Sequence, residues 1–455
     1  MKAKSIIYIG IVLLLLNSCK VGKHYTRPNL NLPEPADSWG TDSTTLANYE
    51  WKELYQDTTL RKLIEQALSY NKDMLMAAAH VKEMAAMKRI SYSGLFPSVN
   101  VNVYGKQEGE NHTGHSFHHK DEYGIKTSAS WEIDLWGNLR WAKDKAVAEF
   151  MQSIENQRAV RMSLIAQVAQ NYFELVALDH ELSIVKQTVE ARRESLHLAR
   201  IRYEGGLTAE TAFRQAQVEL ARTATLLPDL ERKITIKENE IAFLTGEYPH
   251  HIERMPIVGS GIFSDTLPVG LPSTLLERRP DVRSAEQALI AANAQVGMAF
   301  TNLFPKISLT ASYGTESEDL SDILSAPNHF LSVNLLQPIF AAGKNRALLK
   351  GKKAAMEKAT YAYEKAVLQA FKDAHNAIAE FNKMKEIYDR RQRLEQASKS
   401  TLELAKLQYI NGVIGYMDLL DAQRGYLDAQ IGLSKAVRDQ QITTVNLYKA
   451  LGGGW

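Results

Sequence analysis

The sequence predicts a mainly α-helical protein in which very long coiled-coil helices alternate with β-strands of the membrane-spanning kind. No proline occurs between Pro97 and Pro228, and the residues from Gly137 to Tyr203 are mostly strong helix formers. At 1.5 Å per residue this run would span about 100 Å. A second run, free of proline from Ile339 to the C-terminus, follows about 206 residues later. Segments with an apolar residue at every second position precede both runs.

Paired positions indicate an internal repeat. Leu95-Phe-Pro97 corresponds to Leu303-Phe-Pro305 with an offset of 208, and Gly206 corresponds to Gly412 with an offset of 206. A repeat of this length predicts one elongated, pseudo-symmetric body rather than two or three unrelated domains.

The N-terminus has the pattern of a targeting segment. Lys2 and Lys4 form a basic region, and the apolar run from Ile6 to Leu16 is too short to span a membrane comfortably. Leu16-Asn-Ser-Cys19 resembles a bacterial lipobox, which implies cleavage before Cys19 and a covalent lipid on its thiol. The alternative is an ordinary signal peptide that ends near a chance cysteine.

These features divide the chain. The predicted parts are a lipoprotein signal peptide (1–18), an acylated extended segment (19–52), a first repeat (53–247), a connecting region (248–272), a second repeat (273–451) and a C-terminal tail (452–455).

Four segments alternate with period two, with apolar residues predicted to face lipid and polar residues the interior. Their apolar rows are Val99, Val101 and Val103; Ile125 to Ile133 at odd positions; Ile307 to Tyr313 at odd positions; and Leu331, Val333 and Leu335. Each segment is about as long as a transmembrane strand. Four strands cannot close a barrel and open edges are not tolerated in lipid, so several copies must assemble. Trp131, Trp136, Trp141 and Phe340 lie near the predicted strand-to-helix junctions, where an interfacial aromatic belt is expected.

The composition excludes several classes of function. A net charge of +2 on 455 residues does not predict nucleic-acid binding. The sequence contains no phosphate-binding loop, nucleophile elbow, metalloprotease helix or kinase signature, so we do not expect an enzyme.

Asp418 and Asp421 are candidate functional residues. Their spacing of three places both on one helix face, and several copies brought together would form stacked acidic rings of the kind that select or gate cations. The alternative is a solvated helix face whose acids are favoured by the helix dipole.

The polar stretch between the first two predicted strands holds four histidines. They are His112, His115, His118 and His119. Histidines at this spacing could bind a transition metal, but no cysteine or carboxylate completes a site, and a solvated loop is the alternative.

Several motifs together resemble a known family. Leu275-Leu-Glu-Arg-Arg-Pro-Asp-Val-Arg-Ser-Ala-Glu286, followed by Leu303-Phe-Pro305, is similar to the signature of bacterial outer-membrane efflux proteins, the TolC-like family. The segment from Cys19 to Pro28 resembles its acylated lipoprotein branch, which works with resistance-nodulation-division (RND) pumps. Met417-Asp-Leu-Leu-Asp-Ala-Gln423 resembles the periplasmic tip of that family.

The resemblance implies a lipid-anchored homotrimer in the bacterial outer membrane, with a twelve-stranded barrel and a helical tunnel through the periplasm. It also implies that a periplasmic adaptor and an inner-membrane RND pump dock at the tip. By this match Asp418 and Asp421 are gate aspartates and Tyr409 belongs to the closed-state network. The docking turns are Gly205, Gly206, Leu207 and Thr208, and Gly412, Val413, Ile414 and Gly415.

The chain departs from the family pattern at two tip positions. Ile414 stands where some members carry an arginine, and Ala212 stands where some have an acid. Fewer polar links are therefore expected to hold the closed state.

The resulting hypothesis is a passive duct that exports drugs, small toxic molecules or metal ions. One alternative keeps the fold but makes the cargo a polypeptide delivered by an ATP-driven exporter, as in type I secretion. Another is a periplasmic coiled-coil scaffold lipoprotein with no pore.

Overall fold

The computed structural model describes residues 20–30, 45–110, 118–255, 275 and 277–455. The signal peptide and Cys19 lie outside this part of the chain, as do His112, His115 and most of the connecting region. The chain divides into two units, each of which takes segments from both halves of the sequence. Unit 1 comprises Met1–Leu30, His80–Ile154 and Ser284–Lys365, and unit 2 comprises Asn31–Ala79, Glu155–Arg283 and Ala366–Trp455.

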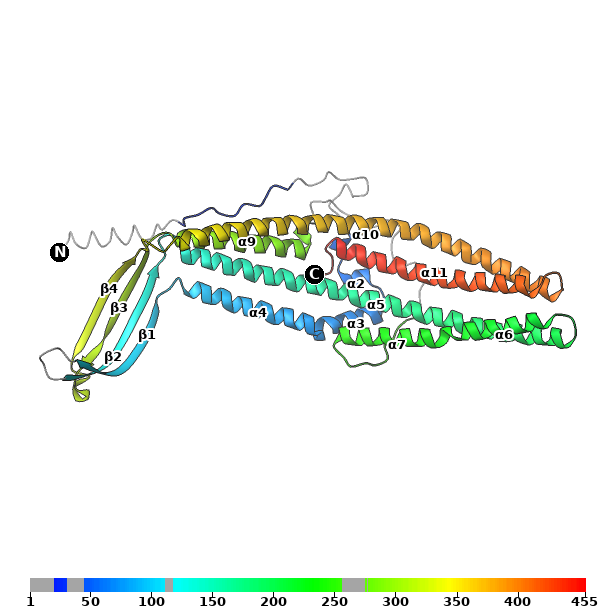
Figure 1. The fold of residues 1–455 in the computed structure, drawn as a ribbon, viewed down its shortest axis with the longest axis horizontal. Helices are drawn as coiled ribbons and strands as arrows, with labels where there is room; N and C mark the ends of the chain where they lie inside the picture. Colours follow the sequence, from blue (N-terminus) through cyan, green and yellow to red (C-terminus); the bar gives the residue numbers. More distant parts are fainter. Residues whose placement is uncertain (1–19, 31–44, 111–117, 256–274, 276) are drawn as a thin grey trace. The chain divides into compact units, whose positions relative to one another are not determined.

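Long helices and one small sheet make up the described residues (Figure 1). The first half contains η1 (Leu46–Asn48), α2 (Trp51–Leu54), α3 (Thr58–Tyr70), α4 (Lys72–Ser93), β1 (Ser98–Glu110), β2 (His118–Ile133), α5 (Asn138–Glu204), α6 (Glu210–Ala224) and α7 (Leu226–Thr245). The second half contains α9 (Pro280–Thr301), β3 (Lys306–Ser317), η2 (Leu320–Asp322), β4 (Pro327–Leu336), α10 (Lys344–Ile410) and α11 (Tyr416–Ala450). The two predicted long helices are confirmed, and α5 and α10 are both 67 residues long.

The four predicted strands form one antiparallel sheet in the order β1-β2-β3-β4 (Figure 1). Its register aligns the apolar rows, as in Val99–Ala129–Ala311–Leu331. Val99 and Val101 are 65% and 67% exposed, and Leu331 and Val333 are 71% and 68% exposed. One face of the sheet is therefore apolar and uncovered by this chain.

The opposite face of the sheet carries polar side chains that bond across three strands. The Tyr104 hydroxyl donates to Glu122 (3.0 Å) and Glu316 (3.2 Å). Lys126 pairs with Glu316 at 2.7 Å, and Lys106 pairs with Glu122 at 3.2 Å. Such a cluster suits aqueous surroundings, and the period-two alternation predicted that this face is the polar, interior one. Phe330 and Leu336 are apolar exceptions, because the register places them in rows with Ser312 and Lys306.

Side chains that bond the backbone determine where the helices begin. Asp134 accepts hydrogen bonds from the amides of Leu139 and Arg140, both at 3.0 Å, which satisfies donors in the first turn of α5. Gly137, the residue immediately before α5, has a φ of +81°.

Two helix breaks were not predicted. Asn71 separates α3 from α4, and its side-chain oxygen accepts from the Met74 amide at 3.1 Å. The return helix of the first hairpin is interrupted at Thr225, and Pro228 follows in the first turn of α7, where proline is tolerated. The second hairpin has no such proline, and α11 runs unbroken.

The internal repeat extends to individual contacts within unit 2. Gly246 and Gly452 end α7 and α11 with φ of +80° and +85°. A Cβ on Gly246 would lie 2.6 Å from the carbonyl oxygen of Tyr70, and one on Gly452 would lie 3.1 Å from the carbonyl carbon of Arg278. Positions 70 and 278 are themselves 208 apart, so both halves use a left-handed glycine to allow the same close approach of two backbones.

The N-terminal segment Lys20–Leu30, here called the strap, packs within unit 1 on α5 and α9. Val21 exchanges hydrogen bonds with the carbonyl of Trp136 (3.1 Å) and the indole N–H of Trp141 (2.8 Å). Arg27 forms a bidentate pair with Glu286, both contacts at 2.7 Å. Because the strap covers Trp141, that side chain is only 2% exposed. Its assignment to an interfacial aromatic belt was therefore wrong.

Among the described residues, none of the helices is both long enough and apolar enough to cross a bilayer.

Replacing Gly246 by alanine should destabilise unit 2 more than replacing Gly206. Both glycines have positive φ, +80° and +73°, but a Cβ at position 206 meets nothing within 4 Å. We expect about 1–2 kcal/mol of backbone strain in each variant, and a further 1–3 kcal/mol, roughly, from overlap with Tyr70 in Gly246→Ala alone. Thermal unfolding of the two purified variants measures the difference. Equal midpoints would contradict the close approach.

Candidate functional site

The two helical hairpins end in turns of the same geometry. Gly206 and Gly412 both have a φ of +73°. The amide of the next residue, Leu207 or Val413, donates to a carbonyl five residues back at 2.8 Å in each case. These are Schellman-type helix ends, which explains the glycine at each position. Leu207 is 73% exposed and Val413 is 69% exposed, so both turns present an apolar side chain to solvent.

Arg202 joins the two hairpin ends within unit 2, which Figure 1 shows next to each other. Its guanidinium donates to the Tyr409 carbonyl at 3.1 Å and lies 4.8 Å from the centre of the Tyr409 ring. The Tyr409 ring in turn meets Tyr416 edge-on at 5.9 Å. Tyr409 is 2% exposed, and burial raises the pKa of its hydroxyl. That hydroxyl has no hydrogen-bond partner among the described residues.

A small apolar cluster surrounds Tyr409. Its buried members are Ala199, Ala216, Ala405, Tyr409, Tyr416, Leu419 and Leu420. Ala212 and Ile414 pack against this cluster, partly buried. These two side chains thus add apolar packing to the cluster, at positions where the resemblance had offered a polar link as the alternative.

A buried charged network lies one to two turns further along the helices and was not predicted. Arg192 donates to the side-chain oxygen of Gln423 at 2.9 Å, and Gln423 donates to the hydroxyl of Ser195 at 3.0 Å. Glu219 lies 3.8 Å from Arg192 and also pairs with Arg424. The network therefore ties α5, α6 and α11 together. One signal in the sequence could have found it: Arg192 interrupts apolar residues that recur three and four positions apart, among them Val189 and Leu196.

The charges in this network depend on one another. Arg192 is 2% exposed and Glu219 is 4% exposed. Burial lowers the pKa of Arg192, whereas the hydrogen bond from Arg424 holds the pKa of Glu219 below its ordinary value of 4.5. The Glu219 carboxylate thus compensates two guanidinium groups, that of buried Arg192 and that of partly exposed Arg424. Loss of Glu219 would leave Arg192 buried without a counter-charge.

The candidate gate aspartates lie just after the second turn. The Asp418 carboxylate accepts a hydrogen bond from the Gly415 amide at 3.0 Å, which is a capping interaction at the start of α11. Asp418 and Asp421 are both exposed. Within one chain they do not join the Tyr409 cluster, and a ring would require further copies.

The histidine candidates are only partly within the described residues. His118 and His119 begin β2, and no group of three or more potential metal ligands occurs in the parts of the chain that the structure describes. The candidate metal site and its alternative, a solvated loop, therefore both stay untested.

Comparison with known proteins identifies the family. The family model for outer membrane efflux proteins matches residues 63–247 and 271–453. The chain belongs to this family. Its members are efflux channels rather than enzymes.

Individual relatives agree over nearly the full length. The cation efflux system protein CusC of Escherichia coli O6:H1 is 30% identical, covering 98% of this chain and 97% of its own. The probable outer membrane lipoprotein SilC of Salmonella typhimurium is 27% identical, covering 98% of each chain. The open-state structure of the outer membrane channel MtrE of Neisseria gonorrhoeae matches with a TM-score of 0.87 and 30% identity, covering 96% of this chain and 98% of its own.

The predicted fold class, function and location are confirmed at this level. The protein is the outer-membrane channel of an efflux system, with long helices that extend into the periplasm and a small β-sheet domain.

Replacing Glu219 by alanine should loosen the first hairpin. Removing one partner of a buried pair costs about 3–5 kcal/mol, so hydrogen exchange in α6 should accelerate strongly. The control is Glu204→Ala, which breaks an exposed pair with Arg200 (2.8 Å) and should cost about 0–1 kcal/mol. Equal exchange rates in the two variants would show that the network does not stabilise the first hairpin.

The same network predicts a pH dependence. Because the folded-state pKa of Glu219 is lowered, its stabilising contribution is complete above its unfolded value of about 4.5 and is lost as pH falls through the lower folded value. The protection of α6 amides in the natural protein, compared at each pH with that in Glu219→Ala, should therefore fall toward the variant's value below pH 4.5. An unchanged difference between the two proteins at acid pH would contradict this assignment.

Proposed function

We propose that three copies of this chain close a twelve-stranded barrel and continue as a helical tunnel toward an RND pump. The open four-stranded sheet is the observation that carries the proposal. Its apolar face is exposed, and β1 and β4 each pair on one side only within the sheet. Backbone groups at such edges need partners in lipid, and β4 of one copy can supply them to β1 of the next. The copy number of three comes from the family resemblance.

We further propose a covalent lipid on Cys19. Lys20, the residue after it, lies against Gly137: a Cβ there would come within 2.9 Å of the Lys20 Cα. Gly137 separates β2 from α5, so chain connectivity attaches the lipid within one residue of the strand-to-helix junction. The name of SilC, a probable lipoprotein, supports the same modification. An acylated cysteine next to the strand-to-helix junction would reinforce the barrel's own membrane attachment.

Asp418 and Asp421 are the proposed periplasmic gate, with Tyr409 in the closed-state contact between hairpins. Both acids are exposed on a helix that starts at a hairpin tip. Three copies would place six carboxylates around one axis, and repulsion or cation binding among them would set the conductance of the closed state. Opening would separate the hairpins that Arg202 and the Tyr409 cluster hold together.

The two exposed turns, Gly205–Thr208 and Gly412–Gly415, are the proposed docking surface for a periplasmic adaptor and the RND pump. Leu207 and Val413 supply apolar contact area there. The cargo class proposed is drugs, small toxic molecules or metal ions, and the printed name of CusC, a cation efflux protein, supports the last of these.

Removing the gate charges should raise the closed-state conductance. Asparagine at 418 and 421 keeps the side-chain shape and the acceptor for the Gly415 amide but removes the charge. The double variant in planar bilayers should conduct several-fold more and lose cation preference. Asp428→Asn, on an exposed acid of the same helix, is the matched control. Unchanged conductance in the double variant would remove both acids from the gate.

Photocrosslinkers at positions 207 and 413 should capture the partners in cells. Recovery of an adaptor and an RND pump is expected, whereas a crosslinker at the exposed Leu368 of α10 should not recover the pump. Recovery of an ATP-driven exporter would instead support polypeptide secretion. If neither is recovered and the protein shows no bilayer conductance, the coiled-coil scaffold would replace the channel complex proposed here.

A further inference from the structure

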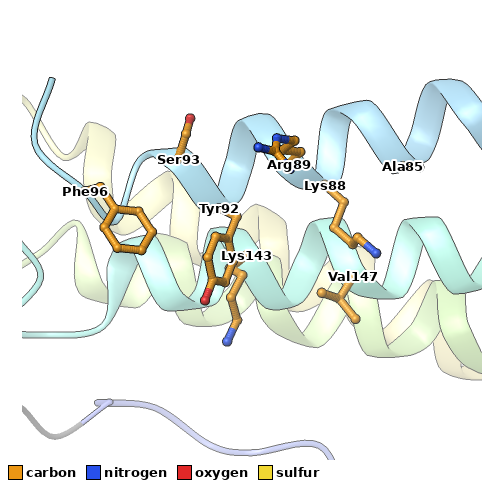
Figure 2. Close-up of a pocket in the computed structure, with 8 residues that line it drawn as sticks. All are labelled: Ala85, Lys88, Arg89, Tyr92, Ser93, Phe96, Lys143 and Val147. Carbon is orange, nitrogen blue, oxygen red and sulfur yellow. The ribbon is translucent and has the colours of Figure 1, made fainter.

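A groove in unit 1 is not used by any of the functions described so far. It lies between the last turns of α4 and the start of α5 and has a volume of about 750 Å³ (Figure 2). Its lining consists of Ala85, Lys88, Arg89, Tyr92, Ser93, Phe96, Lys143 and Val147. Three of these side chains are cationic and none is a carboxylate, so the groove favours an anion.

The groove combines this charge with an apolar wall. In Figure 2 the rings of Tyr92 and Phe96 lie toward the strand-side end of α4, and Lys88 and Val147 lie further along the two helices. The Lys88 ammonium sits 3.9 Å from the centre of the Phe150 ring. This is a cation–π contact, which positions the ammonium at the wall of α5.

The position in the chain places the groove at the edge of the membrane. Phe96 is two residues before Ser98, where β1 begins, and Lys143 is in the second turn of α5, shortly after β2 ends. The strands are the part of an outer-membrane channel that lies in lipid, so residues just beyond their helical ends lie at headgroup level.

Basic residues are also concentrated on the neighbouring start of α10. Residues 344–358 contain six cations, Lys344, Arg346, Lys350, Lys352, Lys353 and Lys358, against a single acid, Glu357. The whole chain has a net charge of only +2. The positive charge is therefore concentrated next to the strands, where anionic headgroups would be met.

We propose that the groove binds the headgroup and upper acyl chain of an anionic phospholipid of the periplasmic leaflet. Lys88, Arg89 and Lys143 would contact the phosphate, since lysine and arginine are the usual phosphate ligands. Tyr92, Phe96 and Val147 would cover the first acyl carbons. When the sheet closes as proposed above, the strand-proximal part of α10 from the next copy would lie beside α4 and add its positive charge to the groove.

Native mass spectrometry of the full-length protein tests the proposal directly. The detergent-purified protein is stripped of lipid and offered dioleoyl-phosphatidylglycerol or dioleoyl-phosphatidylethanolamine, which share their acyl chains and differ in net charge. We expect preferential retention of phosphatidylglycerol. Retention should fall about tenfold in Lys88→Ala/Arg89→Ala, which removes two cations from the groove.

Two further variants distinguish lipid binding in the groove from nonspecific attraction to positive charge on the protein. Arg393→Ala/Lys399→Ala removes one arginine and one lysine from exposed positions of unit 2 and should leave retention unchanged. Lys88→Arg/Arg89→Lys keeps both charges and should retain the lipid, which excludes misfolding as the cause of a loss.

Several outcomes would overturn the proposal. They are equal retention of the two lipids, normal retention by the alanine variant, and an equal loss in the unit 2 control. A loss of oligomer mass in the alanine variant without a lipid preference in the natural protein would show that a second copy fills the groove.

Discussion

The pairing of backbone groups at the edges of the sheet is the constraint on which the rest of the structure depends. Every N–H and C=O in hydrocarbon needs a partner, and a four-stranded sheet leaves two rows unsatisfied. A chain with this sheet must therefore assemble around an axis. Because β1 follows α4 and β4 precedes α10, closing the sheet also brings these helices of adjacent copies together. The helical tunnel is thus a consequence of barrel closure.

Periodicity made most of the secondary structure predictable. The alternation from Val99 to Val103 and the absence of proline between Pro97 and Pro228 are properties of neighbouring residues, so they can be read locally. The breaks at Asn71 and Thr225 were missed for a different reason. Asn71 also donates to the carbonyl of Leu244 at 3.0 Å, and a partner 173 residues away leaves no local pattern.

The site was predictable only in part. The tip turns were found from the family resemblance, and the repeat paired Gly206 with Gly412. The structure adds the reason for the glycines, since both positions are left-handed helix ends. The covering of Trp141 and the Arg192–Glu219–Arg424 network were not found, since both depend on segments that meet only in the folded chain. For Asp418 the structure adds a capping role at the start of α11. The sequence analysis had offered only a solvated helix face, favoured by the helix dipole, as the alternative to a gate.

The hairpin ends combine two kinds of contact that respond differently to opening. The cluster around Tyr409, with Ala212 and Ile414 beside it, is apolar and can slide without leaving a charge unpaired. The Arg192 network is buried and consists of directional hydrogen bonds and ion pairs. Separating its members would leave the Arg192 guanidinium buried without partners, which costs several kcal/mol, roughly. Motion of α10 and the first turn of α11 against the first hairpin should therefore occur at the Tyr409 cluster, while α5, α6 and the part of α11 around Gln423 move as one body. Ala212 and Ile414 add apolar packing at this contact and leave no charge of their own to be desolvated when it separates.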